Sequence, residues 1–582
     1  MVKLYKNLWW FFKKEWKQFL LIALMYITIS LLSVIPTRVI GEVVDLITTK
    51  RLTLEELWQY GFLLVIVPLI IYFLHYFHHY LVNREKHLLG YELRSRYINK
   101  LFDLDHSIYE EYSKGELFSR VTEDLESITV AATHLLESFF SSIVFLFVTV
   151  FAMIFTIHGL LTLVSLALLP FAFIFFFTAI IRMHRQYRRL RERYARMANK
   201  LLESIEGVKV VRAYNGEQKE IEALDRTIDA HESTWQTIVK FEANFHTMFD
   251  FVYLFCFCIA FIYGSHLVLN YALTVGKLIS FVLYLGNLRN PLLKFGGIFS
   301  DGLNAIVSNE RLEAILNKES TVDSVETTCN LVSFESLVFD RVYFKYPFDQ
   351  DYTLKDINLT IHRGETIGVV GPTSSGKSTL IRQVLRQFKL TEGNIFINGE
   401  PIQNYPIEQI RHLIGYVPQS KYLFGTSFNE SLLIDEEELA TEYGWERLER
   451  TLNLVGLKHE FSRYREGHKY RINELGSSLS GGEKQRLAIA RAMLRDPEIL
   501  ILDDSFGALD AKAEKALIEN IRRERKDKTN IIVTKQLAAV KDAHKIVVMD
   551  EGSIVAIGNH EELMATNAWY RHQFELQSGV EE

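Results

Sequence analysis

The chain has 582 residues, too many for a single hydrophobic core, so two or more domains are expected. Its net charge of -6 gives no reason to expect a nucleic-acid partner, and its three cysteines fit neither a disulfide framework nor zinc-binding spacing. A mean hydropathy of +0.06 despite 23% charged residues indicates a very apolar part joined to an ordinary soluble part.

The first eighteen residues mix the aromatic run Trp9–Phe12 with lysines, and they contain neither the apolar core nor the cleavage site of a signal peptide. This mixture is typical of a helix that lies in the cytoplasmic membrane interface.

Apolar stretches follow, each near the ~20 residues that a helix needs to cross the hydrocarbon core of a bilayer. A soluble core could not easily house six of them, so an all-α membrane domain is expected. The predicted spans are 19–40, 61–82, 139–157, 160–181, 249–269 and 277–297.

Loop charge predicts the orientation of these spans. The amino-terminal segment and the regions after the second and fourth spans are strongly basic, whereas His158-Gly159 and 271–276 are short and nearly uncharged. Both termini are therefore expected in the cytoplasm of a multi-pass protein of the cytoplasmic membrane. The long connections 83–133 and 183–245 have helical patterns and should extend the membrane helices into the cytoplasm.

Polar groups inside a span are costly in lipid and often functional. His246 and Asp250 lie at the start of the fifth span and could line a substrate path. Each could equally lie at the interface or pair within the helix bundle.

The composition changes after about residue 315. We expect a membrane domain at 1–316, a polar linker at 317–334 and, because short apolar strands then alternate with helical patterns, an α/β nucleotide-binding domain at 335–582.

The segment Gly371–Thr379 fits G-x-x-x-x-G-K-[ST], a phosphate-binding loop, between an apolar strand and a helix. Its backbone N–H groups and the helix start favour an anion, its lysine can reach the β- and γ-phosphates, and Ser378 can bind Mg²⁺. The residues expected to hold the ATP phosphates are Gly371, Thr373, Ser374, Ser375, Gly376, Lys377, Ser378 and Thr379.

Weaker signals surround this loop. Tyr346 precedes the first long strand pair that we expect and could stack on adenine, although a tyrosine there more often serves packing. Gln419 starts a loop after a strand and could touch Mg²⁺ or the attacking water.

Two further motifs are more specific. The segment 479–485 places Ser480, Gly481, Gly482 and Glu483 at a helix start, which favours a second anion site. An apolar strand ends at Asp503, which can hold Mg²⁺, and a turn with Asp510 follows.

Taken together, the phosphate loop, Gln419, the 479–485 signature, Asp503 and Asp510 occur in the order of the ATP-binding cassette family, which this chain resembles over essentially its whole length. The six spans before the cassette resemble a half-transporter of the exporter type. That resemblance implies a helical subdomain within the cassette, a dimer interface that includes Asp510, and ATP bound between one chain's phosphate loop and the other's signature.

Two positions depart from the family pattern. Asp504 stands where the family usually has a glutamate general base, and Lys535 stands where it usually has a switch histidine. The shorter carboxylate and the loss of the imidazole suggest a slow site, because misplacement on the ångström scale can cost ~10²-fold. The intact signature with altered catalytic positions is similar to one half of heterodimeric bacterial multidrug exporters.

The resemblance implies ATP-driven export of lipophilic, drug-like cargo beside a second, different half-transporter, with Asp504, Lys535 and Gln419 as the catalytic positions. Alternatives are a homodimeric lipid or peptide exporter and a nucleotide-binding regulatory or sensor subunit. A soluble nucleic-acid ATPase is disfavoured by the six predicted spans and the basic loops.

Overall fold

The structure is a computed structural model that describes residues 2–322, 329–347, 349–420, 422–423, 431–432, 441–459 and 479–579. Side chains are described for these residues except at positions 2, 172–185, 188, 245–246, 295–301, 303 and 511. The chain forms two compact units, the first with Met1–Leu101 and Ser113–Lys318, the second with Phe102–Tyr112 and Glu319–Glu582.

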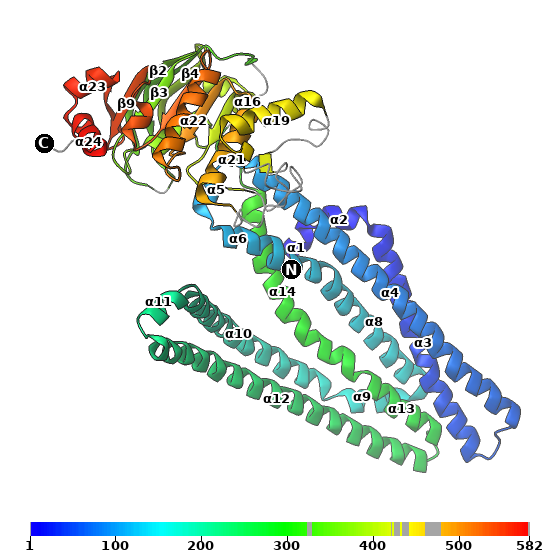
Figure 1. Cartoon of the computed structure of the whole chain (residues 1–582). Helices are drawn as coiled ribbons and strands as arrows, with labels where there is room; N and C mark the ends of the chain where they lie inside the picture. Colours follow the sequence, from blue (N-terminus) through cyan, green and yellow to red (C-terminus); the bar gives the residue numbers. More distant parts are fainter. Residues whose placement is uncertain are drawn as a thin grey trace. The chain divides into compact units, whose positions relative to one another are not determined.

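The first unit consists of long helices, drawn from blue to green in Figure 1. The helices that dominate it are longer than a bilayer is thick, because they continue beyond the apolar stretches as the sequence predicts. In chain order its elements are α1 (Val2–Asn7), α2 (Trp9–Lys14), α3 (Trp16–Thr48), α4 (Leu54–Asp103), α6 (Lys114–Ser119), η1 (Arg120–Asp124), α7 (Leu125–Val130), η2 (Ala131–Leu135), α8 (Leu136–Ala152), η3 (Met153–His158), α9 (Gly159–Leu166), α10 (Leu169–Glu206), α11 (Val208–Ala213), α12 (Glu217–Leu269), α13 (Val275–Asn287) and α14 (Arg289–Leu316).

Among the described residues, four helical segments are long and apolar enough to cross a membrane. They are Trp16–Thr48, Leu54–Asp103, Lys114–Leu166 and Glu217–Leu269. The predicted span 160–181 is divided between α9 and α10, and the predicted span 277–297 between α13 and α14. The count of six spans therefore stays a prediction.

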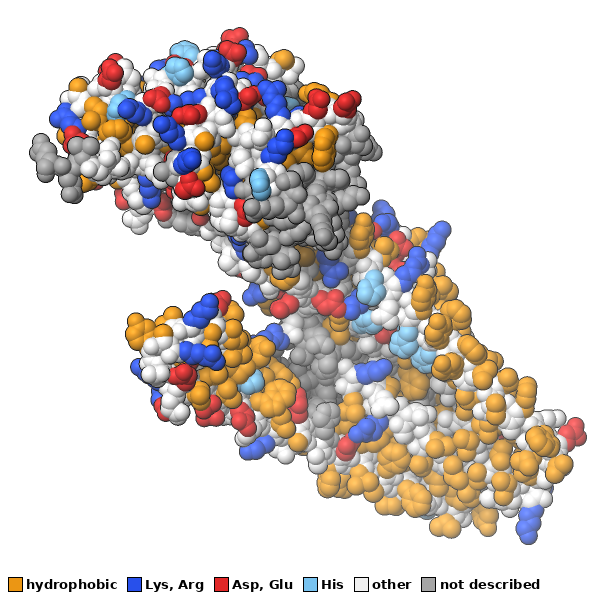
Figure 2. Space-filling view, viewed as in Figure 1, with side chains coloured by type: hydrophobic (Ala, Val, Ile, Leu, Met, Phe, Trp, Pro, Cys, Tyr) orange, Lys and Arg blue, Asp and Glu red, His pale blue; other side chains and the backbone are white. Residues whose placement is uncertain are grey.

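Exposed apolar side chains cover the long helices. On α4 they include Phe62, Tyr72, Phe73, Tyr76 and Phe77, each at least half exposed. Figure 2 shows such orange side chains gathered over the helices of the first unit, whereas the visible face of the second unit mixes both signs of charge. An apolar surface of this extent is stable only against lipid or another protein surface.

The amino-terminal segment forms two short helices rather than one. Leu4, Leu8 and Phe11 are buried within the first unit, while Trp9 is 65% exposed. The Arg96 guanidinium lies over the Trp10 ring at 3.4 Å, so α2 packs on α4. The predicted interfacial helix thus has one face against protein.

The second unit has two sheets and follows the predicted α/β pattern. Within the described residues a four-stranded sheet has the order β2-β1-β4-β5 and a six-stranded sheet the order β10-β9-β3-β8-β7-β6. Strands β9, β3, β8, β7 and β6 run parallel, and β10 is antiparallel to β9. Helices α15 and α22 follow β3 and β7, strands whose residues are all buried, as is typical of parallel sheets covered on both faces.

The elements of the second unit, in chain order, are α5 (Ser107–Glu111), β1 (Ser336–Phe344), β2 (Leu354–His362), β3 (Thr366–Val370), α15 (Lys377–Val384), β4 (Glu392–Ile397), β5 (Glu400–Pro401), η4 (Ile402–Asn404), α16 (Ile407–Leu413), β6 (Ile414–Val417), α19 (Glu442–Leu454), α21 (Gly481–Leu494), β7 (Ile499–Asp503), α22 (Ala511–Glu524), β8 (Thr529–Val533), η7 (Leu537–Val540), β9 (Lys545–Asp550), β10 (Ser553–Gly558), α23 (His560–Thr566) and α24 (Ala568–Ser578).

One short segment of the second unit comes from far earlier in the chain. The segment Phe102–Tyr112, which contains α5, packs with the strands and helices that follow residue 319. The His106 backbone N–H donates to the Gln387 carbonyl oxygen at 3.2 Å, and its ring meets that of Phe388 edge-on. Asp105 accepts hydrogen bonds from the Thr321 hydroxyl and backbone N–H. This attachment was not predicted from the sequence.

Candidate ATP site

The phosphate loop joins the carboxyl end of β3 to the start of α15, as predicted. Gly371 and Gly376 have φ angles of +151° and +95°, which side-chain-bearing residues rarely adopt. A Cβ on Gly371 would lie 2.1 Å from the Met549 carbonyl oxygen, so only glycine fits there. The backbone can therefore curl around an anion at the start of α15.

Lys377 is held inside this loop. Its ammonium donates to the carbonyl oxygens of Gly371 and Pro372, at 2.9 and 2.5 Å, and to the Ser375 hydroxyl at 3.1 Å. Burial lowers the pKa of Lys377, and the nearby positive charge of Lys535 lowers it further, against the opposing effect of Asp504. A polyanion such as a triphosphate would stabilise the positive charge of Lys377.

Asp503 ends β7 beside the loop. Its carboxylate accepts hydrogen bonds from the Ser378 hydroxyl at 3.0 Å and from the Tyr416 hydroxyl at 3.4 Å. Burial raises the pKa of Asp503 although both hydrogen bonds oppose the rise. A hydroxyl and a carboxylate that meet at a phosphate loop are hard oxygen ligands, so the donor set fits Mg²⁺.

Asp504 and Gln419 form a pair at the same end of the sheet. The Gln419 amide donates to the Asp504 carboxylate at 3.1 Å. The backbone of Asp504 has a φ of +47°, a left-handed conformation that aspartate tolerates better than most residues, and its N–H donates to the Val533 carbonyl oxygen. The predicted catalytic positions Asp504 and Gln419 are thus in contact.

A cavity of about 270 Å³ brings most of the predicted site together. Sequence reasoning missed Thr353, just before β2, and Val533 and Thr534, at the end of β8 and just after it, because these residues carry no phosphate-binding motif. The predicted residues that line the cavity are Thr373, Ser374, Ser375, Gly376, Lys377, Ser378, Thr379, Gln419, Asp503, Asp504 and Lys535. Tyr416 is a further missed contact of Asp503.

The signature residues lie at the start of α21 and outside that cavity's lining. Ser480 caps the helix with a capping box, in which Glu483 accepts from the Ser480 backbone N–H at 2.7 Å. Gly481 is exposed and Gly482 half-buried, so backbone N–H groups at this helix start can be approached. Asp510 caps α22 by accepting from the Ala513 N–H at 2.8 Å.

Tyr346 follows β1 rather than preceding the first strand pair. Its hydroxyl lies 3.0 Å from the Thr379 hydroxyl, and the Arg382 guanidinium donates to it at 3.1 Å. Its ring meets Phe344 and Phe388 edge-on. Tyr346 is therefore anchored to the helix of the phosphate loop, and its stacking on adenine stays a prediction.

The two polar residues predicted for a substrate path differ in what the structure describes. Asp250 on α12 accepts two hydrogen bonds from the Arg289 guanidinium, at 2.9 and 2.6 Å. The side chain of His246 lies outside the described part of the chain. Asp250 is thus paired with a cation at the start of α14.

A phosphate loop, a strand-end acid pair and long apolar helices define a P-loop ATPase built into a membrane protein. The chain belongs to the ABC transporter family: residues 19–292 match the ABC transporter transmembrane region and residues 354–507 match the ABC transporter ATP-binding part. It is accordingly a multi-pass ATPase-coupled transmembrane transporter that binds ATP.

Whole-length relatives support this assignment. The chain is 32% identical over 99% of its length to the probable multidrug resistance ABC transporter ATP-binding/permease protein YheI of Bacillus subtilis (strain 168), covering 98% of that protein. It is 27% identical to the multidrug resistance-like ATP-binding protein MdlA of Escherichia coli (strain K12), over 99% of this chain and 97% of that one.

A solved structure shares the fold. The structure of a bacterial Atm1-family ABC exporter with ATP bound matches 97% of this chain and 99% of its own, with a TM-score of 0.82 and 19% sequence identity. At that identity the likeness establishes the exporter fold of fused transmembrane and ATP-binding domains.

Proposed function

We propose that this chain is one half of a heterodimeric exporter that uses ATP to move lipophilic, drug-like compounds out across the cytoplasmic membrane. The observation that carries the proposal is the pair of Asp504 and Gln419 beside Lys535 in the ATP cavity. The fold of an exporter and relatives named for multidrug resistance support the cargo class.

The chain's own ATP site would bind ATP and hydrolyse it slowly. The phosphate loop has its glycines, Lys377 and Ser378 in place, whereas Asp504 has one methylene less than a glutamate base and Lys535 is no neutral imidazole. Ser378, Asp503 and Gln419 would hold Mg²⁺, which supplies charge neutralisation of the phosphates when bound.

The signature would serve the partner's site. The exposed start of α21, with Ser480 and Gly482, would approach ATP on the partner's phosphate loop, and Asp510 would lie at that interface. ATP binding would then close two different cassettes, and hydrolysis in the partner's site would reset them.

Topology completes the proposal. Six spans within residues 1–316, a linker at 317–334 and a cassette at 335–582 would place both termini in the cytoplasm, on the side of the basic loops.

The test is ATPase activity of this chain purified alone and co-purified with a candidate partner half-transporter. Little activity alone and strong activity together supports the heterodimer, whereas equal activity per site alone points to a homodimer.

Two variants of this chain distinguish the heterodimer from the homodimer further. Ser480→Arg should abolish the activity of the pair, while Asp504→Asn should change it less than twofold; a homodimer would lose its activity with either.

Transport into vesicles distinguishes an exporter from the remaining alternative, a regulatory or sensor subunit. A regulatory or sensor subunit predicts nucleotide binding without vectorial movement of a lipophilic dye when the active pair is reconstituted. An exporter predicts ATP-dependent dye movement that Ser480→Arg abolishes.

A further inference from the structure

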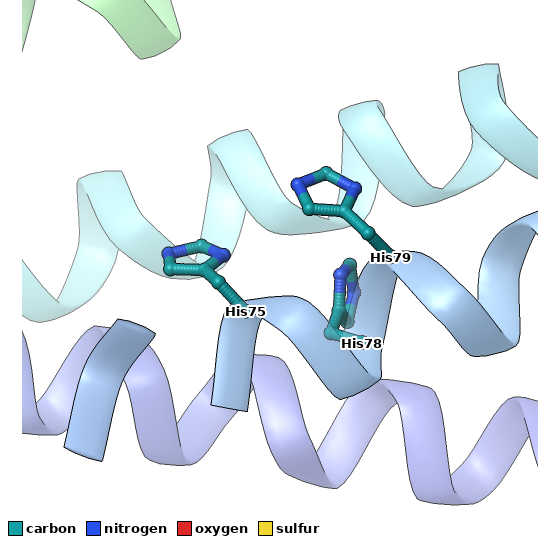
Figure 3. Close-up of side chains that lie close together, drawn as sticks. All are labelled: His75, His78 and His79. Carbon is teal, nitrogen blue, oxygen red and sulfur yellow. The ribbon is translucent and has the colours of Figure 1, made fainter. Parts of the chain in front are cut away.

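Three histidines lie on one face of α4, near the end of its apolar stretch and just before the basic residues Arg84 and Lys86. His75, His78 and His79 follow i, i+3, i+4 spacing, which brings side chains together on a helix. One ligand nitrogen from each lies within 4.8 Å of those of the other two. Figure 3 shows the three imidazoles gathered above one turn of the helix.

The central histidine, His78, is buried at 1% exposure. Among the described residues, neither of its ring nitrogens has a hydrogen-bond partner. A buried imidazole without partners is costly, above all within a membrane-spanning helix, so this position calls for a bound group.

A carboxylate from a neighbouring helix faces the same histidine. Glu137 Oε1 on α8 lies 3.7 Å from His78 Nε2, too far for a hydrogen bond but near the separation of two ligands on one ion. Ligands about 2.0–2.1 Å from a tetrahedral Zn²⁺ are separated by roughly 3.3 Å. Small side-chain rotations would therefore complete the set.

We propose that His75, His78 and His79, with Glu137, form a binding site for a divalent transition-metal ion on α4. Imidazole nitrogens select ions such as Zn²⁺, Co²⁺ or Ni²⁺ over Mg²⁺ and Ca²⁺, and the carboxylate supplies negative charge in an otherwise apolar region. This site is separate from the ATP cavity and its magnesium ligands.

The surroundings give an ion access from one side. His75 and His79 line a cavity of about 680 Å³, together with Asn83 and Arg84 and the tyrosines Tyr72, Tyr76 and Tyr80. On the other side, His78 and Glu137 line a smaller cavity of about 200 Å³ between α3, α4 and α8. The three histidines thus connect an open, aromatic cavity with a half-buried carboxylate.

The positive charge of Lys294 opposes an ion here. Lys294 on α14 is close enough to act electrostatically on both His75 and Glu137. It competes with a bound cation for the Glu137 carboxylate, so the neutral variant Lys294→Met is expected to bind the metal more tightly than the parent protein.

The experiment uses the full-length protein in detergent, purified without a polyhistidine tag and stripped with a chelator. Zn²⁺ is titrated in competition with a chromophoric chelator, and Co²⁺ is titrated to record its visible absorption. We expect one ion per chain and a Co²⁺ spectrum of tetrahedral intensity. The double variant His75→Gln/His79→Gln should weaken binding at least about 100-fold, more than the loss of a supporting partner would.

His87→Gln is the matched control, because His87 lies on α4 and lines the same large cavity but is outside the cluster. Its binding should equal that of the parent protein. If the double variant fails to fold, metal binding is measured in two single variants instead. These are His79→Gln, at an exposed position, and Glu137→Gln. The proposal is overturned if the stripped protein binds no stoichiometric ion, or if these variants bind as the parent does.

Discussion

The side-chain amide of Gln419 donates a hydrogen bond to the carboxylate of Asp504 across 3.1 Å, which links the loop after β6 to the end of β7. Both residues line the ATP cavity with Lys377 and Lys535. We expect a carboxylate that is held by Gln419 and is one methylene short of a glutamate to take a proton slowly from water at the γ-phosphate. This relationship makes the proposed slow site testable.

Restoring the family residues should accelerate hydrolysis at this chain's site. We expect Asp504→Glu combined with Lys535→His to raise its turnover by about 10- to 100-fold, because the carboxylate regains roughly an ångström of reach. The measurement is ATPase activity of the pair in which the partner's own phosphate-loop lysine has been replaced by alanine, so that the partner's site is silent.

Lys535→His alone serves as the control for this change. It should give little acceleration, since the base is still short. Unaltered turnover in the double variant would show that Asp504 and Lys535 do not limit this site.

ATP binding to the chain should depend on Lys377. Replacing a buried, charge-pairing ammonium by alanine costs about 2 kcal/mol or more, so Lys377→Ala should weaken binding more than tenfold. A fluorescent ATP analogue titrated onto the purified chain measures this. Lys389→Ala removes an exposed lysine outside the cavity lining and should bind normally. Equal affinities in both variants would contradict the assignment of the phosphate loop.

The ATP site could be predicted in most of its parts because its chemistry is encoded locally. The residues from Gly371 to Thr379 and the acid at Asp503 follow strands within a few positions, so spacing alone places them. Tyr416 was missed because its contact with Asp503 depends on β6 lying beside β7 in the sheet. That adjacency is tertiary information.

The membrane part was less predictable for a physical reason. Hydropathy reports apolar length but not where one helix ends and the next begins, and the predicted spans 160–181 and 277–297 are each divided between successive helices. Hydropathy gives no signal for the attachment of Phe102–Tyr112 to the second unit either. Ile108, at 1% exposure, is the only buried residue of that segment. The pairing of Asp250 with Arg289 needed the contact between α12 and the first residue of α14 to be known.

The Asp250–Arg289 ion pair should contribute to the stability of the membrane helices. Removing one partner leaves the other charge unpaired, so Asp250→Asn and Arg289→Gln should each lower the melting temperature in detergent. Because both side chains are nearly half exposed, about 1 kcal/mol is the expected scale. The exchanged variant Asp250→Arg/Arg289→Asp should recover most of the loss. If it is no more stable than the single variants, the pair is not a stabilising contact, and a role for Asp250 in the cargo path becomes the better explanation.

Attachment of the Phe102–Tyr112 segment should depend on the charge of Asp105. Burial pushes the pKa of Asp105 up, but hydrogen bonds from Ser107 and Thr321 outweigh it and hold the pKa below its ordinary value. A carboxyl whose pKa is lowered by folding stabilises the folded state above its ordinary pKa, and this stabilisation is lost as the pH falls through the lowered value. At pH 7 the contribution is therefore fully present.

Asp105→Asn keeps the shape of the side chain but removes its charge. We expect amide hydrogen exchange in residues 105–112 to become about tenfold faster at pH 7, since hydrogen bonds to a charged group are worth about 1.5–3 kcal/mol each and a neutral amide keeps only part of that. The melting temperatures of the variant and the parent should converge only below the ordinary pKa of an aspartate, as the pH falls through the lowered pKa of Asp105 and the parent's carboxyl loses its charge. Asp103→Asn removes the same charge two residues earlier, at an exposed position, and should leave the exchange unchanged. Equal acceleration in both variants would mean that net charge, and not the Asp105–Thr321 contact, holds the segment in place.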